Sequence, residues 1–294
     1  MIIVITGPTG VGKTKLSIEL AKIYNAEIIN ADATQIYKGL DIGSAKVTEL
    51  EKENIHHHLL DIKEVDEAYS IYDYQKDCRK CIDEITKRGK NIIIVGGTGL
   101  YIKSALYDYT LSENNTINNQ YEDKTTEELY QELVKLDKDI VIDKNNRRRV
   151  VRALNYYYAT GKSINENKQG NKLLYDAIFI GLTLENRSEL YDRINNRVDE
   201  MIENGLLDEV KAFYDKNVRT KPLLNAIGYK ELYQYFDGRI TYEDAIELIK
   251  RNSRRYAKRQ YTFFNHQFNI KWFNTNLKNF DKTIKEVQNY IEKK

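Results

Sequence analysis

The residues with the clearest chemical signature form a glycine-rich turn near the start of the chain. Residues 7–14 read Gly-Pro-Thr-Gly-Val-Gly-Lys-Thr and follow directly on the apolar run Ile2–Thr6. A strand that leads into such a turn, with a helix beginning at the lysine, presents backbone N–H groups and a helix N-terminus to phosphate oxygens. The lysine adds positive charge, and the final hydroxyl is suited to contact Mg²⁺. The pattern predicts a phosphate-binding loop made by Gly7, Pro8, Thr9, Gly10, Val11, Gly12, Lys13 and Thr14.

Two polar residues follow the next predicted strands. Asp32 comes after Glu27–Asn30, and Thr98 comes after Asn91–Val95, within Gly-Gly-Thr-Gly. The carboxyl ends of parallel strands meet at one edge of a sheet, so both should lie near the phosphate loop. Asp32 is either a general base or a cap of the following turn. Thr98 either offers its hydroxyl to the site or simply forms the turn. The Gln35 amide could contact the edge of a nucleic-acid base.

The strand Asn91–Val95 is followed by glycines and Thr98, with no carboxylate. ATPases with a phosphate loop usually carry an acidic residue at this point to hold Mg²⁺. Its absence argues against an ATPase, although a small-molecule kinase remains possible.

Two segments are rich in positive charge. One contains Arg147, Arg148, Arg149 and Arg152, and the other is Lys250–His266, which has six lysines and arginines interleaved with aromatic residues and no acidic residue. The chain as a whole has a net charge of only +2, so this clustering is local. A solvated helix face is one interpretation. The lack of acids favours binding of a polyanion, and basic side chains mixed with rings suit RNA.

Two other groups suggest metal sites only superficially. Cys78 and Cys81 form a C-x-x-C within the predicted helix Ser70–Lys87, without a second cysteine pair, whereas structural zinc requires four ligands. The triplet at 56–58, His-His-His, is predicted to lie in a loop. We therefore expect no metal at either position.

The order of elements indicates an α/β fold. Strands and helices alternate through the first hundred residues, which is typical of a parallel sheet flanked by helices. We expect a phosphate-loop core made of residues 1–110 and 168–294. Residues 111–167 should form a small all-helical insertion, with a loop at 112–124. The remaining predicted elements are a strand at Ala177–Leu184 and helices at Lys13–Tyr24, Thr126–Leu136, 146–160, Arg187–Glu203, Leu206–Tyr214 and, as the last element, 242–266.

Composition sets broad limits. The chain has 294 residues, of which 41% are hydrophobic and 31% charged, enough for a core in a soluble protein. No apolar run reaches the length of a membrane span, and the N-terminus has the pattern of a core strand. We expect a cytoplasmic protein that does not interact with membranes, and no feature calls for a protein partner.

Taken together, these motifs resemble the bacterial tRNA dimethylallyltransferase family, and the likeness runs almost from end to end. The segments that carry it are 7–14, 30–46, His57–Ile62, Gly96–Tyr101, Arg148–Leu154, Leu190–Met201, Gly205–Val210, Ala226–Glu231 and Ala257–Gln260.

The resemblance implies a reaction, partners and site residues. The phosphate loop would hold dimethylallyl diphosphate, with Mg²⁺ bridging it to Thr14. Asp32 and Thr98 would be catalytic, with Asp32 accepting the proton from N6 of adenosine 37 in the tRNA anticodon stem-loop. The enzyme would act as a monomer. The residues expected to contact tRNA are Asp32, Ala33, Thr34, Gln35, Arg148, Arg149, Arg152, Gly228, Tyr229, Lys230, Arg254, Lys258, Arg259 and Gln260.

The chain departs from the family pattern at four places. Ala33 replaces the usual serine, Asn225 replaces glutamine or arginine, and His56 replaces proline. The insertion is also shortened between Asn119 and Thr126, which bears on how the RNA is clamped rather than on the chemistry.

Three other functions compete with this interpretation. A transferase that prenylates free adenine nucleotides would share the loop and Asp32, but it would not need extended basic segments. A small-molecule kinase would share the loop alone. A non-catalytic RNA-binding module would need neither Asp32 nor Thr98 at adjacent strand ends. Dependence on free nucleotide, on ATP, or on tRNA with a prenyl donor discriminates among them.

Overall fold

The computed structural model of the chain describes residues 1–109, 111, 121, 123–166 and 171–294. These residues divide into two compact units, which are Met1–Leu106 together with Leu174–Lys294, and Tyr107–Leu173. We call them the core and the insertion unit. Most of the loop predicted at 112–124 lies outside the described residues. Within the described ranges, no helix is both long and apolar enough to cross a membrane.

The core is built on one parallel sheet, as the sequence predicts. Its strand order is β3-β2-β4-β1-β5-β6, and every pairing is parallel. Strands β1, β2 and β4 are largely buried and mostly apolar, as expected for strands that helices cover on both faces. The strands are β1 (Ile2–Thr6), β2 (Ala26–Asn30), β3 (His57–His58), β4 (Asn91–Val95), β5 (Ala177–Thr183) and β6 (Lys271–Asn274).

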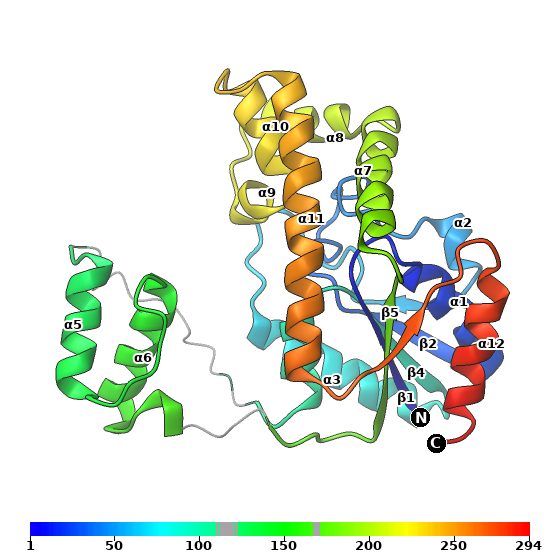
Figure 1. Cartoon of the computed structure of the whole chain (residues 1–294), viewed down its shortest axis with the longest axis horizontal. Helices are drawn as coiled ribbons and strands as arrows, with labels where there is room; N and C mark the ends of the chain where they lie inside the picture. Colours follow the sequence, from blue (N-terminus) through cyan, green and yellow to red (C-terminus); the bar gives the residue numbers. More distant parts are fainter. Residues whose placement is uncertain (110, 112–120, 122, 167–170) are drawn as a thin grey trace. The chain divides into compact units, whose positions relative to one another are not determined.

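Helices cover both faces of the sheet (Figure 1). Helices α1 (Lys13–Tyr24) and α12 (Phe280–Ile291) contact each other on one face. Helices α3 (Ile71–Lys87) and α4 (Gly99–Leu106) lie together on the other, where α4 also contacts α11 (Tyr242–Gln267). The remaining core helices are α2 (Glu49–Lys52), α7 (Arg187–Glu203), α8 (Leu206–Tyr214), α9 (Lys221–Asn225) and α10 (Tyr229–Phe236).

The long helix α11 organises the part of the core beyond the strand ends. It contacts α7 and α10, and with them it extends past the carboxyl ends of the strands in Figure 1. Its buried residues, Ala245, Ile249, Ala257, Gln260 and Phe264, recur at helical spacing and form one stripe. One side of this helix therefore faces the strand ends while the other faces solvent.

The insertion unit is helical in its described part. It contains α5 (Thr126–Leu136), α6 (Arg147–Thr160) and a short 3₁₀ turn at Ile164–Glu166. Apolar side chains of α5 and α6, among them Leu129, Leu133, Val150 and Leu154, form a separate hydrophobic core. The unit therefore has its own packing.

Two expectations about elements are wrong. The histidine triplet is not in a loop, because His57–His58 pairs with β2 as the edge strand β3. The helix α11 is not the last element, because β6 extends the sheet beside β5 and α12 then packs on α1. A four-residue strand such as Lys-Trp-Phe-Asn carries too little alternation to be recognised by pattern alone.

Candidate active site

The predicted phosphate loop connects β1 to α1. Gly12 is the residue before α1 and adopts a left-handed conformation with φ of 90°, which a glycine tolerates without strain. The Lys13 side chain turns inward, and its ammonium donates hydrogen bonds to the carbonyls of Gly7 at 3.0 Å and Pro8 at 2.8 Å. The loop lines a cavity of about 850 Å³ at the carboxyl edge of the sheet.

The electrostatic environment of Lys13 is unusual. Burial of its ammonium and, to a smaller extent, the nearby Arg197 guanidinium lower the pKa of Lys13 to about 7, although Asp32 opposes the shift. The same positive field and the inward-turned lysine favour an anion in the adjacent cavity. An anionic ligand placed there would raise the lysine pKa again.

Arg197 and Arg193, both on α7, were missed by sequence reasoning. The Arg197 guanidinium donates to the Thr9 hydroxyl at 2.8 Å, and Arg193 donates to the Gly10 carbonyl at 2.9 Å. Burial lowers the pKa of Arg197, although a guanidinium stays charged at physiological pH. The spacing of four residues places both on one face of α7. The sequence of α7 also contains acidic residues, so its net charge does not reveal this basic face.

Asp32 leaves β2 and enters the cavity. Its Oδ1 atom accepts a hydrogen bond from the Thr34 N–H at 2.9 Å, which is the turn-capping role considered from the sequence. Its field acts on Lys13, on Arg197 and on Tyr256, so the carboxylate lies among these groups. The structural role uses one oxygen, which leaves room for a chemical role at the other.

Thr98 is not among the residues that line the cavity, although the preceding Gly96 and Gly97 are. Its hydroxyl accepts a hydrogen bond from the Ala33 N–H at 3.0 Å, and its own N–H donates to the Ala31 carbonyl at 3.0 Å. The Thr98 side chain also lies near the Tyr256 phenol, where it lowers the pKa of Tyr256 against the larger rise caused by burial. The ends of β2 and β4 are thus connected, as the sequence predicts for neighbouring strand ends.

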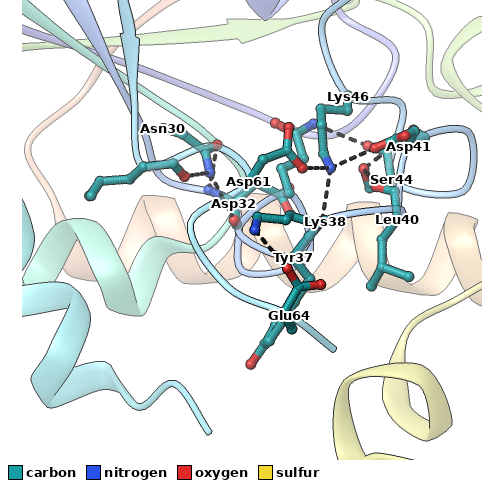
Figure 2. A network of polar contacts seen from close by, with 12 residues as sticks. Asn30, Asp32, Tyr37, Lys38, Leu40, Asp41, Ser44, Lys46, Asp61 and Glu64 are labelled. Carbon is teal, nitrogen blue, oxygen red and sulfur yellow. Dashed lines mark hydrogen bonds and ion pairs between the residues drawn. The ribbon is translucent and has the colours of Figure 1, made fainter. Parts of the chain in front are cut away.

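The segment after Asp32 is fixed by polar contacts (Figure 2). The Lys46 ammonium, whose side chain is only 5% exposed, contacts Asp61, Asp41 at 2.6 Å and the Tyr37 carbonyl at 2.8 Å. The Gln35 amide donates to the carbonyls of Ser44 and Ala45. Gln35 and Thr34 both line the cavity. The two hydrogen bonds of the Gln35 NH₂ group therefore help to fix the conformation of this segment.

Three residues predicted to contact tRNA have hydrogen-bond partners within the core unit. Tyr229 is fully buried, and its hydroxyl donates to Glu209, so its ring packs in the interior instead of facing RNA. Gln260 is 5% exposed and bonds to two loops. The Arg254 guanidinium donates to Asn195. Tyr229 and Gln260 are thus buried in this structure, whereas Arg254 is half-buried and contacts α7.

Other predicted RNA contacts are accessible. Gly228 and Lys230 line the cavity, and Arg259 lies at its rim with its guanidinium 5.8 Å from the Tyr256 ring. Lys258 is exposed on the outer side of α11. Ala33 lies between Asp32 and Thr34 and is half-buried.

In the insertion unit, the arginines of α6 divide into two groups. Arg147 donates to the backbone carbonyls of Tyr121 and Lys124 and so stabilises the start of α5. Arg148, Arg149 and Arg152 are exposed. Spacings of three and four residues place Arg149 and Arg148 beside Arg152 on one face of the helix. That face has a concentrated positive charge.

Two groups bear on metal binding. Cys78 and Cys81 are free, and burial raises the pKa of their thiols to about 12 and about 11. Glu27, His56 and His58 come close enough for a metal ion. However, the Glu27 carboxylate already binds Arg88 at 2.6 Å, Lys90 at 3.1 Å and His58 at 2.7 Å. The charges of Arg88 and Lys90 oppose a further positive charge, and burial lowers the pKa of His58.

The fold and the site define a phosphate-loop α/β protein whose loop shares its cavity with a carboxylate. Comparisons with known proteins narrow this class. The IPP transferase family model matches residues 35–267, and the chain belongs to that family.

Relatives match over nearly the whole chain. A tRNA dimethylallyltransferase of Anoxybacillus flavithermus is 50% identical over 100% of this chain and 96% of its own length. The crystal structure of a tRNA isopentenylpyrophosphate transferase from Bacillus halodurans is 42% identical, covers 99% of this chain and 95% of its own, and gives a TM-score of 0.78. A eukaryotic dimethylallyltransferase acting on tRNA is 32% identical over 100% of this chain and 80% of its own, with a TM-score of 0.85.

Proposed function

We propose that the protein transfers a dimethylallyl group from dimethylallyl diphosphate to N6 of adenosine 37 in tRNA. One observation carries the proposal beyond family membership. Lys13 of the phosphate loop and the carboxylate of Asp32 line the same cavity, so a diphosphate donor and an acceptor that must lose a proton can meet there. The products are N6-dimethylallyladenosine and diphosphate.

The phosphate loop and two basic side chains bind the leaving group. As the bond between the allylic carbon and oxygen breaks, negative charge collects on the diphosphate. Lys13, Arg197 and the loop N–H groups stabilise that charge because they are already oriented in a partly buried site. These interactions strengthen as the negative charge develops, so they stabilise the transition state more than the bound substrates.

Asp32 accepts the proton of the attacking nitrogen. The C–N6 bond forms while the C–O bond of the donor breaks, and the proton on N6 passes to the carboxylate. Thr34 holds one oxygen of Asp32 through its N–H, which fixes the carboxylate toward the acceptor. Thr98 holds the same turn through Ala33.

The basic surfaces bind the RNA. Adenosine 37 must leave its stack to reach the cavity, and basic and aromatic side chains favour single-stranded, unstacked bases. Lys258 and Arg259 on α11 and the arginines of α6 would contact the anticodon stem-loop. We infer a monomeric enzyme because the cavity is completed within one chain.

The residues present fit a magnesium ion. Thr14 is exposed at the cavity and offers one hydroxyl oxygen, and Mg²⁺ typically takes few protein ligands and completes its shell with waters and substrate phosphates. Thr14 would hold the ion, which would help neutralise the diphosphate when bound.

The test is transfer of label from dimethylallyl diphosphate to unmodified tRNA containing A36-A37-A38, comparing the wild-type protein with Asp32→Ala. We expect label on A37 from the wild type and a loss of about a hundredfold or more in the variant. Label on free AMP instead of tRNA would point to a nucleotide prenyltransferase. Consumption of the ATP γ-phosphate would point to a kinase. Binding of tRNA without either reaction would leave an RNA-binding module.

A further inference from the structure

The side chain of Gln260 connects two loops that the proposed reaction uses. Its Oε1 atom accepts a hydrogen bond from the Thr9 N–H at 3.2 Å, and its Nε2 atom donates to the Gly97 carbonyl at 3.1 Å. Thr9 belongs to the phosphate loop, and Gly97 belongs to the turn between β4 and α4. A single buried amide therefore joins the two loops from α11.

Position 97 leaves space for this amide because glycine has no side chain. A Cβ atom built on Gly97 would lie 2.2 Å from the Nε2 atom of Gln260. The same Cβ would lie 3.7 Å from the Oδ2 atom of Asp32. The Gln260 amide thus occupies the space beside the carboxylate proposed as the base.

A second contact from α11 reinforces the connection. Tyr256 lies one turn before Gln260, and its phenol is near enough to Gln260 and Thr98 that both side chains lower the pKa of Tyr256, against the larger rise caused by burial. The Thr98 hydroxyl in turn accepts from the Ala33 N–H, next to Asp32. Gln260 and Tyr256 of α11 thus lie between the phosphate loop and the turns that hold Thr98 and Asp32.

We propose that Gln260 is a positioning residue that fixes the separation between the diphosphate-binding loop and the turns carrying Thr98 and Asp32. This inference rests on the proposed function, since it assigns the donor to the first loop and the acceptor to the second. The exposed neighbours Lys258 and Arg259 are available to RNA, whereas Gln260 faces inward. Its loss should slow the chemical step because the reactants are misaligned, without weakening either substrate's binding.

The first experiment replaces Gln260 with methionine, which has a similar volume but makes neither hydrogen bond. We expect the single-turnover rate at saturating substrates to fall roughly tenfold to a hundredfold. The Kd values for dimethylallyl diphosphate and for tRNA should stay within about twofold of wild type, because this change leaves Lys13, Arg197 and the exposed arginines in place. Thermal unfolding establishes that the variant is folded.

The matched control is Gln288→Met on α12. The Gln288 amide donates to Glu292 within the same helix, so the chemical change is identical while no loop of the site is touched. We expect wild-type rates from this variant.

The second variant, Gln260→Glu, gives a signature that simple destabilisation would not produce. A carboxylate can still accept from Thr9, but it repels the Gly97 carbonyl. When protonated, the same side chain can donate to Gly97 and so reproduces the amide pattern. The ratio of the variant's rate to the wild-type rate should therefore rise as pH falls.

The outcomes separate the two proposals. An unchanged rate in Gln260→Met, or a loss matched by an equal loss of tRNA or donor affinity, overturns the positioning role alone. If that variant does not fold, a rate ratio for Gln260→Glu that does not change with pH overturns it. Absence of transfer by the wild-type protein would overturn the proposed function, and the positioning role with it.

Discussion

Positive charge is placed differently in the two compact units of this protein. In the core, Lys13 and Arg197 are partly buried, and each donates to the phosphate loop itself. In the insertion unit, Arg148, Arg149 and Arg152 project from α6 into solvent. The core cations are held by named partners, whereas none of these three guanidinium groups donates a hydrogen bond to a residue that the structure describes.

The difference in exposure determines what each group of charges can do. Buried charges act through a medium of low dielectric, so one lysine can interact strongly with a diphosphate at short range. Exposed arginines are screened by salt and individually contribute little, but together they attract a polyanion. The core cations should therefore control the chemical step, and the α6 arginines should control RNA affinity.

Removing the buried lysine should have the largest effect on the transfer reaction. Lys13→Ala deletes the ammonium that faces the leaving diphosphate, and we expect transfer to fall by about 10²–10³-fold. Its affinity for tRNA and the salt dependence of that affinity should stay unchanged, because the exposed arginines are untouched. Transfer kinetics and filter binding across a salt series measure the two effects.

Lys22→Ala is the matched control for Lys13→Ala. Lys22 lies on the same helix but outside the phosphate loop, and it pairs with Glu19 and Glu53. We expect normal transfer from this variant. A large loss of tRNA affinity in Lys13→Ala would show that the two groups of charges are not separate.

Replacing the three exposed arginines should produce the reverse pattern. In Arg148→Gln, Arg149→Gln, Arg152→Gln, we expect tRNA affinity to fall on the order of tenfold at low salt. The slope of log affinity against log salt should decrease by roughly one for each RNA phosphate that the variant no longer neutralises. The rate at saturating tRNA should remain within about twofold of wild type, since the cavity is intact.

A variant with the same change in net charge tests whether location matters. Lys282, Lys285 and Lys293 are exposed on or next to α12. Their replacement by glutamine should leave the salt slope close to wild type. An equal decrease from both triple variants would mean that overall charge, and not the α6 surface, attracts the RNA.

The sequence was sufficient to locate the phosphate loop and the sheet that carries it. β1, α1 and β4 have the predicted bounds, and β2 begins one residue earlier, at Ala26. Continuous apolar runs and glycine-rich turns are strong local signals, so strand ends and their polar residues could be placed on one edge. Local pattern could not indicate that α7, far along the chain, brings Arg193 and Arg197 back to that loop.

In the acid-free segment of α11, charge composition did not distinguish buried from exposed positions. The lack of acids favours a polyanion-binding surface, and the family resemblance places Arg254 and Gln260 among the residues that contact tRNA. The helical period already separates these positions, because Gln260 falls in the same stripe as Ala257 and Phe264. The charge of a segment does not indicate which of its polar residues are buried, whereas the position of Gln260 within an apolar stripe does.

The smallest expected effect tests the electrostatics of the buried lysine directly. Burial lowers the pKa of Lys13 to about 7, with Arg197 adding to the shift, so at pH 8 the amine is mostly neutral. A bound diphosphate raises this pKa, and donor binding at pH 8 should therefore take up most of one proton. Calorimetry in buffers of different ionisation enthalpy measures the uptake, and Lys13→Arg should eliminate it because a guanidinium does not titrate there. We expect no such proton uptake when tRNA binds alone to the exposed α6 arginines, because guanidinium groups do not titrate in this pH range. Donor binding without proton uptake would mean that Lys13 is already charged, and that its burial does not distinguish it from the surface cations.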